Sequence, residues 1–333
     1  MSRVAIIGAG TVGSVVVRML RASQGVEVAG VLVRDAAKPR GFEDWRRVVT
    51  VDPEVLDRVD LVIEVAGGTG PAADHMLAAL ARGVPVVTAN KAALAERWDE
   101  FATHLNAGQV WCEAAVMAGT PIVGPLTKAL AGCRPVSLHA ILNGTCNVVL
   151  SDMEAGMAFE EALSRAQAAG FAEADPTLDV EGIDAAHKAT VLARLAFDPA
   201  LPFQQVRDAT VGISGLDSTV VADQVRRGRS VRLVASVHAG PDGWRAAVRP
   251  LSLPAEHPLV TRGAVNAAVF VGDPVGEVYV RGAGAGGGST ATAVVSDALA
   301  ALAGGRGHTP RAAAAALPPD AERLALPQGA EEL

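Results

Sequence analysis

A glycine-rich turn between a buried strand and a helix is the feature that most limits what this chain can fold into. The turn runs from Gly8 to Gly13, directly after the apolar run Arg3 to Ile7 and directly before the helical stretch Ser14 to Arg21. In such a turn the first glycine permits a tight bend, the second lets backbone approach a pyrophosphate, and the third lets the helix pack on the strand. The context predicts a dinucleotide site whose contacts are Gly8, Gly10, Thr11, Val12 and Gly13.

The first third of the chain alternates apolar runs with helical stretches. The runs Arg3 to Ile7, Val26 to Val33, Asp60 to Val65 and Val84 to Thr88 are nearly continuous in Val, Ile and Leu. Continuous apolar runs of this length are typical of parallel strands that are buried on both faces. We therefore expect an α/β, Rossmann-type nucleotide-binding domain over residues 1–130.

Basic residues follow the second of these strands. Arg34 stands where a fold specific for NAD usually has an acid for the ribose 2′-hydroxyl, and Lys38 and Arg40 come soon after it. Positive charge at this place suits a 2′-phosphate, so NADP is favoured and NAD remains an alternative. A solvated basic loop would give the same pattern.

Two later segments belong to the same edge of the predicted sheet. Gly67 opens a Gly67 to Gly70 turn after the third strand, and Lys91 ends the Thr88 to Lys91 segment after the next. Ligands bind outside the carboxyl ends of such strands, so Gly67 and Lys91 are predicted to contact the cofactor. Lys91 is also placed to meet a substrate carboxylate, and a lysine that merely caps a strand is the alternative.

The second half of the chain changes its periodicity. Alternating segments there predict a mixed sheet with one helical face, and we expect an α+β domain over residues 131–283. The segments are Pro135 to Leu142, Ser230 to His238, Trp244 to Pro250, Val265 to Gly272 and Gly276 to Val280. A glycine run that includes Gly284 then opens a helix, and the stretch near 284–304 is expected to return to the first domain and touch the cofactor. Residues 305–333 are expected to form a C-terminal tail.

An acidic segment from Gly170 to Lys188 is typical of an active site. Five carboxylates precede one lysine, and Pro176 and Gly182 break the segment into a loop and then a helix. Asp184 and Lys188 are four residues apart, so both side chains leave the same face of that helix. A lysine beside carboxylates in a cleft can deliver or take a proton.

Composition narrows the class of partner. A net charge of −7 and a pI near 5.5 disfavour nucleic acid and anionic membranes, both of which call for basic patches. The apolar stretches are short and interrupted, so neither a signal peptide nor a transmembrane helix is expected. Three cysteines without paired spacing fit a reducing compartment, and the expected location is the cytoplasm.

Together these segments resemble the homoserine dehydrogenase family. The resemblance rests on six motifs in the family's order: Gly8 to Gly13, Thr88 to Lys91, Glu113 to Val116, Ile141 to Thr145, Glu173 to Lys188, and Gly284 to Asp297. It implies reversible NAD(P)-dependent reduction of L-aspartate 4-semialdehyde to L-homoserine, a step in threonine, methionine and isoleucine biosynthesis. It also implies a homodimer, a small-molecule substrate, and a monofunctional form without a C-terminal regulatory domain.

The resemblance assigns roles to residues of this chain. It implies Lys188 as the acid-base, with Asp184 and Lys91 beside it in catalysis. Its substrate contacts are Glu173, Asp179, Gly144 and Thr145. It further implies a sodium site formed by main-chain oxygens of Glu113, Val116, Ala118 and Thr120.

Two rival functions share part of this pattern. A Rossmann dehydrogenase for another amino acid or amino-aldehyde, such as an aspartate dehydrogenase, has the glycine turn and an acid-base but not the full segment Glu173 to Lys188. A non-catalytic nucleotide sensor needs no acid-base at all, so Lys91 and Lys188 argue against it.

Overall fold

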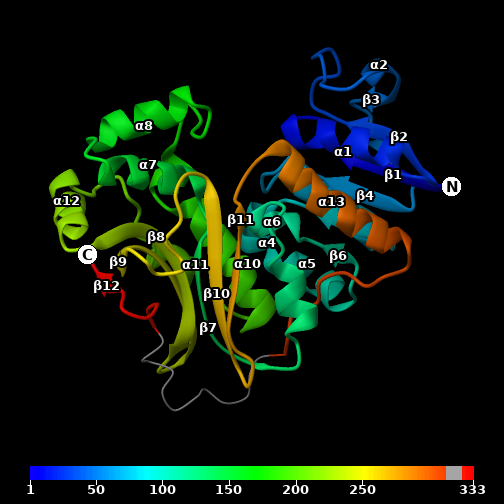
Figure 1. Cartoon of the computed structure of the whole chain (residues 1–333). Coiled ribbons are helices and arrows are strands. Elements are labelled where there is room, and N and C mark those ends of the chain that lie inside the picture. Colours follow the sequence, from blue (N-terminus) through cyan, green and yellow to red (C-terminus); the bar gives the residue numbers. More distant parts are fainter. Residues whose placement is uncertain (313–324) are drawn as a thin grey trace. The chain divides into compact units, whose positions relative to one another are not determined.

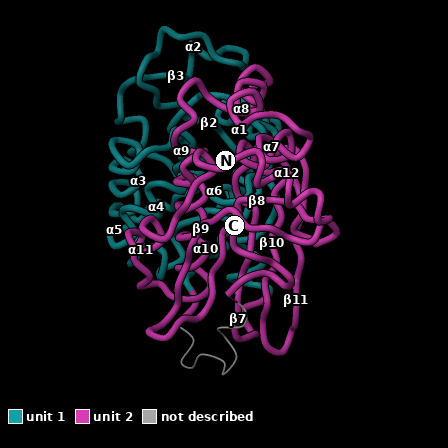
Figure 2. The backbone as a smooth tube through the Cα atoms, turned by 90° about the vertical axis from the view of Figure 1, so that its left-hand side faces the viewer, with its two compact units in different colours: residues 1–129, 285–310 teal, residues 130–284, 311–333 magenta. Residues whose placement is uncertain are grey.

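The computed structural model describes residues 1–312 and 325–333, and the chain divides into two compact units. Unit 1 comprises residues 1–129 and 285–310, and unit 2 comprises residues 130–284 and 311–333 (Figure 2). Each unit is therefore built from two separate stretches of chain.

Unit 1 contains a parallel sheet, as the apolar runs predict. Its strand order is β3-β2-β1-β4-β5-β6, and all its pairs are parallel (Figure 1). The strands are β1 (Ser2–Ile7), β2 (Val26–Leu32), β3 (Val49–Thr50), β4 (Leu61–Glu64), β5 (Val86–Thr88) and β6 (Val110–Trp111). The order reverses between β1 and β4, and a reversal of this kind is where doubly wound sheets bind their ligands.

Helices cover both faces of this sheet. α1 and α13 pack together on one face, and α3 and α5 lie against each other beside β4 and β5. The helical elements of unit 1 are α1 (Thr11–Ala22), α2 (Trp45–Val48), η1 (Pro53–Leu56), α3 (Pro71–Ala81), α4 (Lys91–Glu96), α5 (Trp98–Asn106), α6 (Ala114–Met117), η2 (Pro125–Ala129) and α13 (Gly287–Leu302).

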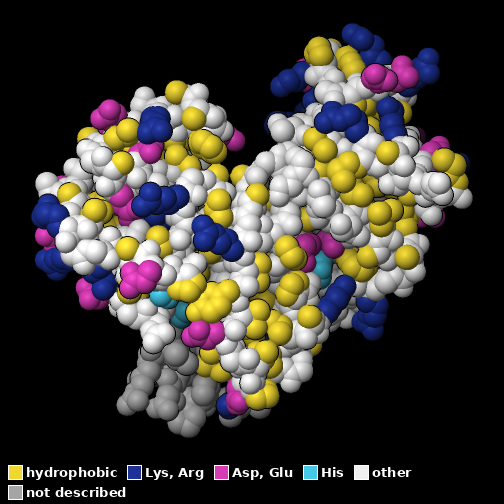
Figure 3. All heavy atoms as spheres, viewed as in Figure 1, with side chains coloured by type: hydrophobic (Ala, Val, Ile, Leu, Met, Phe, Trp, Pro, Cys, Tyr) yellow, Lys and Arg dark blue, Asp and Glu magenta, His cyan; other side chains and the backbone are white. Residues whose placement is uncertain are grey.

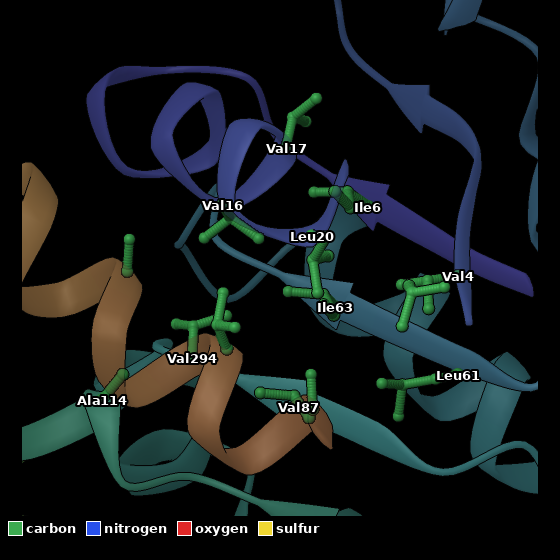
Figure 4. Packing of buried hydrophobic residues seen from close by; sticks show 14 of the residues in the cluster. Val4, Ile6, Val16, Val17, Leu20, Leu61, Ile63, Val87, Ala114 and Val294 are labelled. Atoms are coloured by element: carbon green, nitrogen blue, oxygen red, sulfur yellow. The ribbon is translucent and has the colours of Figure 1, made fainter. Parts of the chain in front are cut away.

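The core of unit 1 joins segments from opposite ends of the chain. Leu20 of α1, Ile6 of β1, Ile63 of β4 and Val294 of α13 are fully buried in one apolar cluster (Figure 4). Burying a side chain of this size contributes about 1.5–3 kcal/mol, so α13 stabilises a sheet whose strands all precede residue 112.

The sheet of unit 2 is antiparallel in every pair of its named strands, rather than mixed as expected. Its order is β11-β10-β7-β8-β9-β12 (Figure 1). The strands are β7 (Arg134–Ile141), β8 (Arg229–Gly240), β9 (Gly243–Pro254), β10 (Val265–Asp273), β11 (Gly276–Ala283) and β12 (Glu331–Glu332). Two tight hairpins, β8–β9 and β10–β11, account for four of the strands, and a two-residue connection forces antiparallel pairing.

Helices of unit 2 pack on this sheet. α10 and α11 contact β9, while α7 and α12 contact β8. The helices are α7 (Gly144–Glu154), α8 (Phe159–Ala168), α9 (Thr177–Val180), α10 (Ile183–Ala196), α11 (Phe203–Asp208) and α12 (Ser218–Arg226).

The C-terminal stretch expected as a tail is divided between the two units. Residues 305–310 belong to unit 1, where His308 N–H bonds to the Val110 carbonyl, and residues 313–324 lie outside the described part of the chain. Farther on, β12 adds an edge strand to β9, and Arg229 and Arg249 pair with Glu331 and Glu332. The end of the chain is thus part of the sheet of unit 2. Within the described ranges, no helix is both long and apolar enough to cross a membrane.

Candidate active site and cofactor pocket

A pocket of about 760 Å³ lies in unit 1 beside the point where the strand order reverses. The loops after β1, β2 and β4 line it, and they bring together Gly8, Gly10, Arg34, Lys38 and Gly67. These five were predicted as cofactor contacts. A volume of this size is within the usual range for a small-molecule or cofactor site.

Two glycines of the turn, Gly8 and Gly13, are packed too tightly to be replaced by larger residues. Gly8 has a φ of +100°, and a Cβ there would lie 2.8 Å from the Ala66 nitrogen. A Cβ on Gly13 would lie 2.2 Å from the Gly8 carbonyl oxygen. Gly8 therefore permits the bend and lines the pocket, whereas Gly13 permits the close packing of α1 on the turn and lies outside the set that lines the pocket.

One wall of the pocket is basic. Arg34 and Lys38 are exposed, while Arg40 donates to the main-chain oxygens of Ala9 and Asp35. Lys and Arg side chains gather over this part of unit 1, around α2 and β3 (Figure 3). Arg40 thus ties the loop after β2 to the glycine turn, and this wall suits an anionic group.

Other predicted cofactor contacts lie outside the set that lines the pocket. Thr11 and Val12 begin α1, and the Thr11 methyl group packs against Gly287. Lys91 is the first residue of α4, directly after the carboxyl end of β5. Gly284 belongs to unit 2, where a Cβ would lie 2.2 Å from the Asn266 side-chain oxygen.

Lys188 is the centre of a polar cluster in unit 2. Its ammonium group donates to the Asp184 carboxylate at 2.6 Å and to the Leu142 carbonyl oxygen at 2.8 Å. The side chains of Lys188 and Asp184 are only 12% and 11% exposed. An ammonium group carries three hydrogens. Two have acceptors within the described residues, so one is left for a bound molecule.

Asn143 joins the two carboxylates of this cluster. Its amide nitrogen donates to Asp179 at 2.7 Å and to Asp184 at 2.9 Å. Its side-chain oxygen accepts the Cys146 N–H at 2.8 Å and so caps α7. Asn143 belongs to one of the six sequence motifs, but no role was predicted for it. The signal available was an asparagine at a strand end just before a helix, which predicts a cap but not the bridge.

The remaining predicted substrate contacts lie around this bridge. Thr145 has its hydroxyl 3.0 Å from Asp179 and 2.8 Å from the Phe171 carbonyl oxygen. Gly144 and Thr145 begin α7, so their N–H groups belong to a helix N-terminus. Glu173 is exposed, and its main-chain oxygen accepts a hydrogen bond from Gln167. Asp179 and Thr145 therefore join the Lys188 cluster, whereas among the residues that the structure describes no hydrogen bond joins Glu173 to it.

The loop predicted to bind sodium is in unit 1. Ala118 has a φ of 54° and a ψ of −115°, and Thr120 N–H bonds to the Met117 carbonyl, which closes a turn. The Glu113 carboxylate accepts the N–H groups of Ile122, Val123 and Gly124 at 2.6 to 2.8 Å. Three bonds to one carboxylate hold both ends of the loop together.

Asp297 and His308 lie against this loop. Asp297 accepts the Glu113 N–H, and burial raises the pKa of its carboxyl to about 7. Burial, and then the charge of Lys128, lower the pKa of His308 to about 3. His308 is therefore neutral at physiological pH, and its contacts of 3.8 Å to Glu113 and 4.0 Å to Asp297 are not ion pairs.

Both parts of the chain match family models. Residues 8–113 match the model described as "Homoserine dehydrogenase, NAD binding domain", and residues 121–299 match the model described as "Homoserine dehydrogenase".

Similar proteins and structures carry the same description. A homoserine dehydrogenase of Synechocystis is 39% identical over 315 residues, which cover 89% of this chain and 72% of that protein. One of Bacillus subtilis is 36% identical, over 90% of this chain and 72% of that protein. The crystal structure of a homoserine dehydrogenase from Thiobacillus denitrificans superposes with a TM-score of 0.80 at 35% identity, covering 90% of this chain and 72% of that one. A hyperthermophilic archaeal homoserine dehydrogenase in complex with NADPH gives a TM-score of 0.77 at 28% identity, over 92% of this chain and 99% of that one.

Proposed function

Because this chain belongs to the homoserine dehydrogenase family, we propose how its own residues divide the work of that reaction. The protein is an NAD(P)-dependent oxidoreductase that reversibly reduces L-aspartate 4-semialdehyde to L-homoserine. The reduction adds a hydride to the aldehyde carbon and a proton to its oxygen. The nicotinamide cofactor, when bound, supplies the hydride, so the protein must supply the proton and hold the substrate.

The observation that carries the proposal is the double anchoring of Lys188. Asp184 and the Leu142 carbonyl fix the ammonium group, so its remaining hydrogen has a defined direction. In reduction Lys188 donates this proton to the aldehyde oxygen. In oxidation the neutral amine takes the proton from the homoserine hydroxyl. Asp184 orients Lys188 in both directions.

The substrate's own charges find partners in the same unit. The first N–H groups of α7, at Gly144 and Thr145, suit the substrate carboxylate because a helix N-terminus attracts anions. Glu173 and Asp179 suit its ammonium group, since charge-assisted hydrogen bonds are the strong ones. We assign Lys91, in unit 1 at the carboxyl end of β5, to contact with the nicotinamide and to a share in the proton transfer.

The test follows the absorbance of the reduced nicotinamide with aspartate 4-semialdehyde and NADPH or NADH. Lys188→Ala is expected to lower kcat about a hundredfold or more, as is usual when a general acid is removed. Lys188→Arg is the matched control, because arginine keeps the charge but does not release a proton near neutral pH. Wild-type turnover in either variant would overturn the role of Lys188. Tight nucleotide binding without turnover in the unmodified protein would favour the sensor or another substrate.

We also propose that NADP is preferred over NAD. Support comes from Arg34 and Lys38, which line the basic wall of the pocket with Arg40 behind them. Each charge-assisted contact with a 2′-phosphate is worth about 1.5–3 kcal/mol, so Arg34→Ala should lower kcat/KM for NADPH by about tenfold or more. The rate with NADH should stay within about twofold, since NADH lacks that phosphate. An equal fall with both cofactors would contradict the proposal.

We further propose a sodium ion on the loop of Glu113, Val116, Ala118 and Thr120. The turn at Ala118 keeps a backbone conformation that alanine rarely adopts, and such conformations persist where a ligand site needs them. Main-chain oxygens suit a hard cation, which would fix the loop in place. Thermal unfolding in sodium chloride, compared with choline chloride at equal ionic strength, should show a higher Tm with sodium. Equal values would contradict the site.

We propose, finally, a cytoplasmic homodimer. β11 is an edge strand, and Tyr279 within it and Val275 directly before it are each 46% exposed, so this edge needs a cover. The three cysteines are free, as in proteins of reducing compartments. Light scattering coupled to size exclusion should give twice the chain mass, and a monomer at micromolar concentration would contradict this assembly.

A further inference from the structure

Glu64 is a buried carboxylate that the proposed chemistry does not use. It ends β4, in the middle of the parallel sheet, where it pairs with Ile7 of β1 and Thr88 of β5. Its exposed fraction is 0%. A lone buried carboxylate costs several kcal/mol unless hydrogen bonds satisfy it, so the partners of Glu64 indicate why it is there.

Those partners belong to two loops. One carboxylate oxygen accepts the N–H groups of Ala66 and Gly67 at 2.8 and 2.6 Å. The other accepts the Thr88 hydroxyl at 2.7 Å. Ala66 and Gly67 line the cofactor pocket, whereas Thr88 leads into Lys91. The Glu64 side chain therefore forms hydrogen bonds both to the wall of the cofactor pocket and to Thr88, which precedes Lys91.

Asn90 completes the link to Lys91. Its N–H donates to the Thr88 hydroxyl oxygen at 3.0 Å, and its side-chain nitrogen donates to the Gly68 carbonyl at 2.7 Å. Its side-chain oxygen caps α4, of which Lys91 is the first residue. The Thr88 hydroxyl donates its single proton to Glu64, and its oxygen accepts the N–H of Asn90.

The chain of bonds fits an ionised Glu64. All three of its contacts are donors, which a carboxylate satisfies without a proton of its own. Burial raises the pKa of Glu64, and its hydrogen bonds to Thr88, Gly67 and Ala66 oppose that rise. An apolar residue at this position would leave these three donors without an acceptor, so the carboxyl group of Glu64 holds both loops in place.

We propose that Glu64 is a positioning residue that fixes Lys91 and the pocket loop Ala66 to Gly68 to one another. It touches neither reacting atom and acts through Thr88 and Asn90. The inference rests on the proposed role of Lys91. The position of Lys91 therefore depends on the carboxylate of Glu64, which lies inside the sheet.

The experiment compares kcat and the KM values for NADPH and aspartate 4-semialdehyde in Glu64→Gln, Thr88→Val and the double variant. Glutamine keeps the volume but presents an amide donor to the Thr88 hydroxyl, and valine removes that hydroxyl. Each single variant should lower kcat at least tenfold and raise the KM for NADPH severalfold, with the KM for the aldehyde within twofold. The double variant should be no slower than the slower single one, because both cut the same link. Thr88→Ser, which keeps the hydroxyl, should recover at least half of the wild-type kcat.

Glu154→Gln is the matched control for loss of stability. Glu154 is also a glutamate with three hydrogen bonds, and its side chain is only 12% exposed, but it lies in unit 2 and pairs with Arg232. The control should lower Tm while leaving kcat per folded molecule unchanged. If Glu64→Gln behaves like this control, with kcat and both KM values within twofold of the wild type, the positioning role is refuted.

Lys91→Ala separates this inference from the proposed function. If Lys91→Ala turns over at the wild-type rate, the assignment of Lys91 fails, and the proposed link to it fails as well. If Lys91→Ala is slow and Glu64→Gln is not, the function stands and the inference alone is overturned. Slow turnover in both supports the inference.

Discussion

Asn143 offers the sharpest test of how the Lys188 cluster is held. Asn143→Ser removes the amide that donates to Asp179 at 2.7 Å and to Asp184 at 2.9 Å, but serine remains a good cap for α7. A hydrogen bond to a charged group is worth about 1.5–3 kcal/mol. If the loss of one such bond weakens the positioning of Asp184 by this amount, kcat/KM should fall roughly 10- to 100-fold. About 1.4 kcal/mol corresponds to each factor of ten in rate.

Steady-state rates and urea unfolding of three variants isolate this effect. Asn143→Asp also keeps the cap but donates nothing and adds a third carboxylate, so it should be slower than the serine variant. Asn143→Ala loses the cap as well, which should cost about 1 kcal/mol of unfolding free energy relative to serine. Turnover of the serine variant within twofold of the wild type would show that the bridge is irrelevant to catalysis. An aspartate variant as fast as the wild type would refute the reasoning about charge.

Three further predictions concern stability and reactivity. Glu154→Gln leaves the fully buried Arg232 without its carboxylate, and urea titration should show a loss of about 3–5 kcal/mol; a loss below about 1 kcal/mol would contradict a buried ion pair. Burial, and then the nearby carboxylates, raise the pKa of the Cys112 and Cys146 thiols well above the usual value. Both thiols therefore stay protonated at pH 8, and mass spectrometry should find neither cysteine alkylated before the protein is unfolded. Rapid labelling of the native protein would contradict the raised pKa of these thiols. Ala118→Gly relieves about 1–3 kcal/mol of backbone strain against about 0.4–1 kcal/mol of added chain entropy, so the free energy of unfolding should rise by about 1 kcal/mol. A decrease in the same urea titration would mean that the turn is not strained.

The sequence predicts the parallel sheet well because its strands are buried on both faces. Such strands are largely apolar, and the runs at β1, β2, β4 and β5 show this despite Glu27 in β2 and Glu64 in β4. β3, β6 and β12 have only two residues each, so no periodicity identifies them. β12 consists of two glutamates. Its place is decided by backbone pairing with Leu251 and Ser252 of β9 and by the ion pairs of its side chains with Arg229 and Arg249.

The candidate site is predictable only where its residues are close in sequence. Asp184 and Lys188 are four residues apart on one helix, so their contact follows from helical geometry. The contact of Asn143 with Asp184 spans 41 positions and depends on where β7 ends relative to α10. From the sequence, Glu64 is predicted only as a residue near the end of an apolar strand. The structure shows that its carboxylate bonds to two loops.

The order in which the chain is synthesised has a consequence for how unit 1 forms. Its sheet is complete once residue 111 has been made, but α13, which closes its core over α1, does not begin until residue 287. A nascent chain must therefore carry the open apolar face of that sheet while all of β7 to β11 is synthesised. During translation this face is a natural target for holdase chaperones, and a ribosome-stalled chain that ends before α13 should be cut by protease within unit 1.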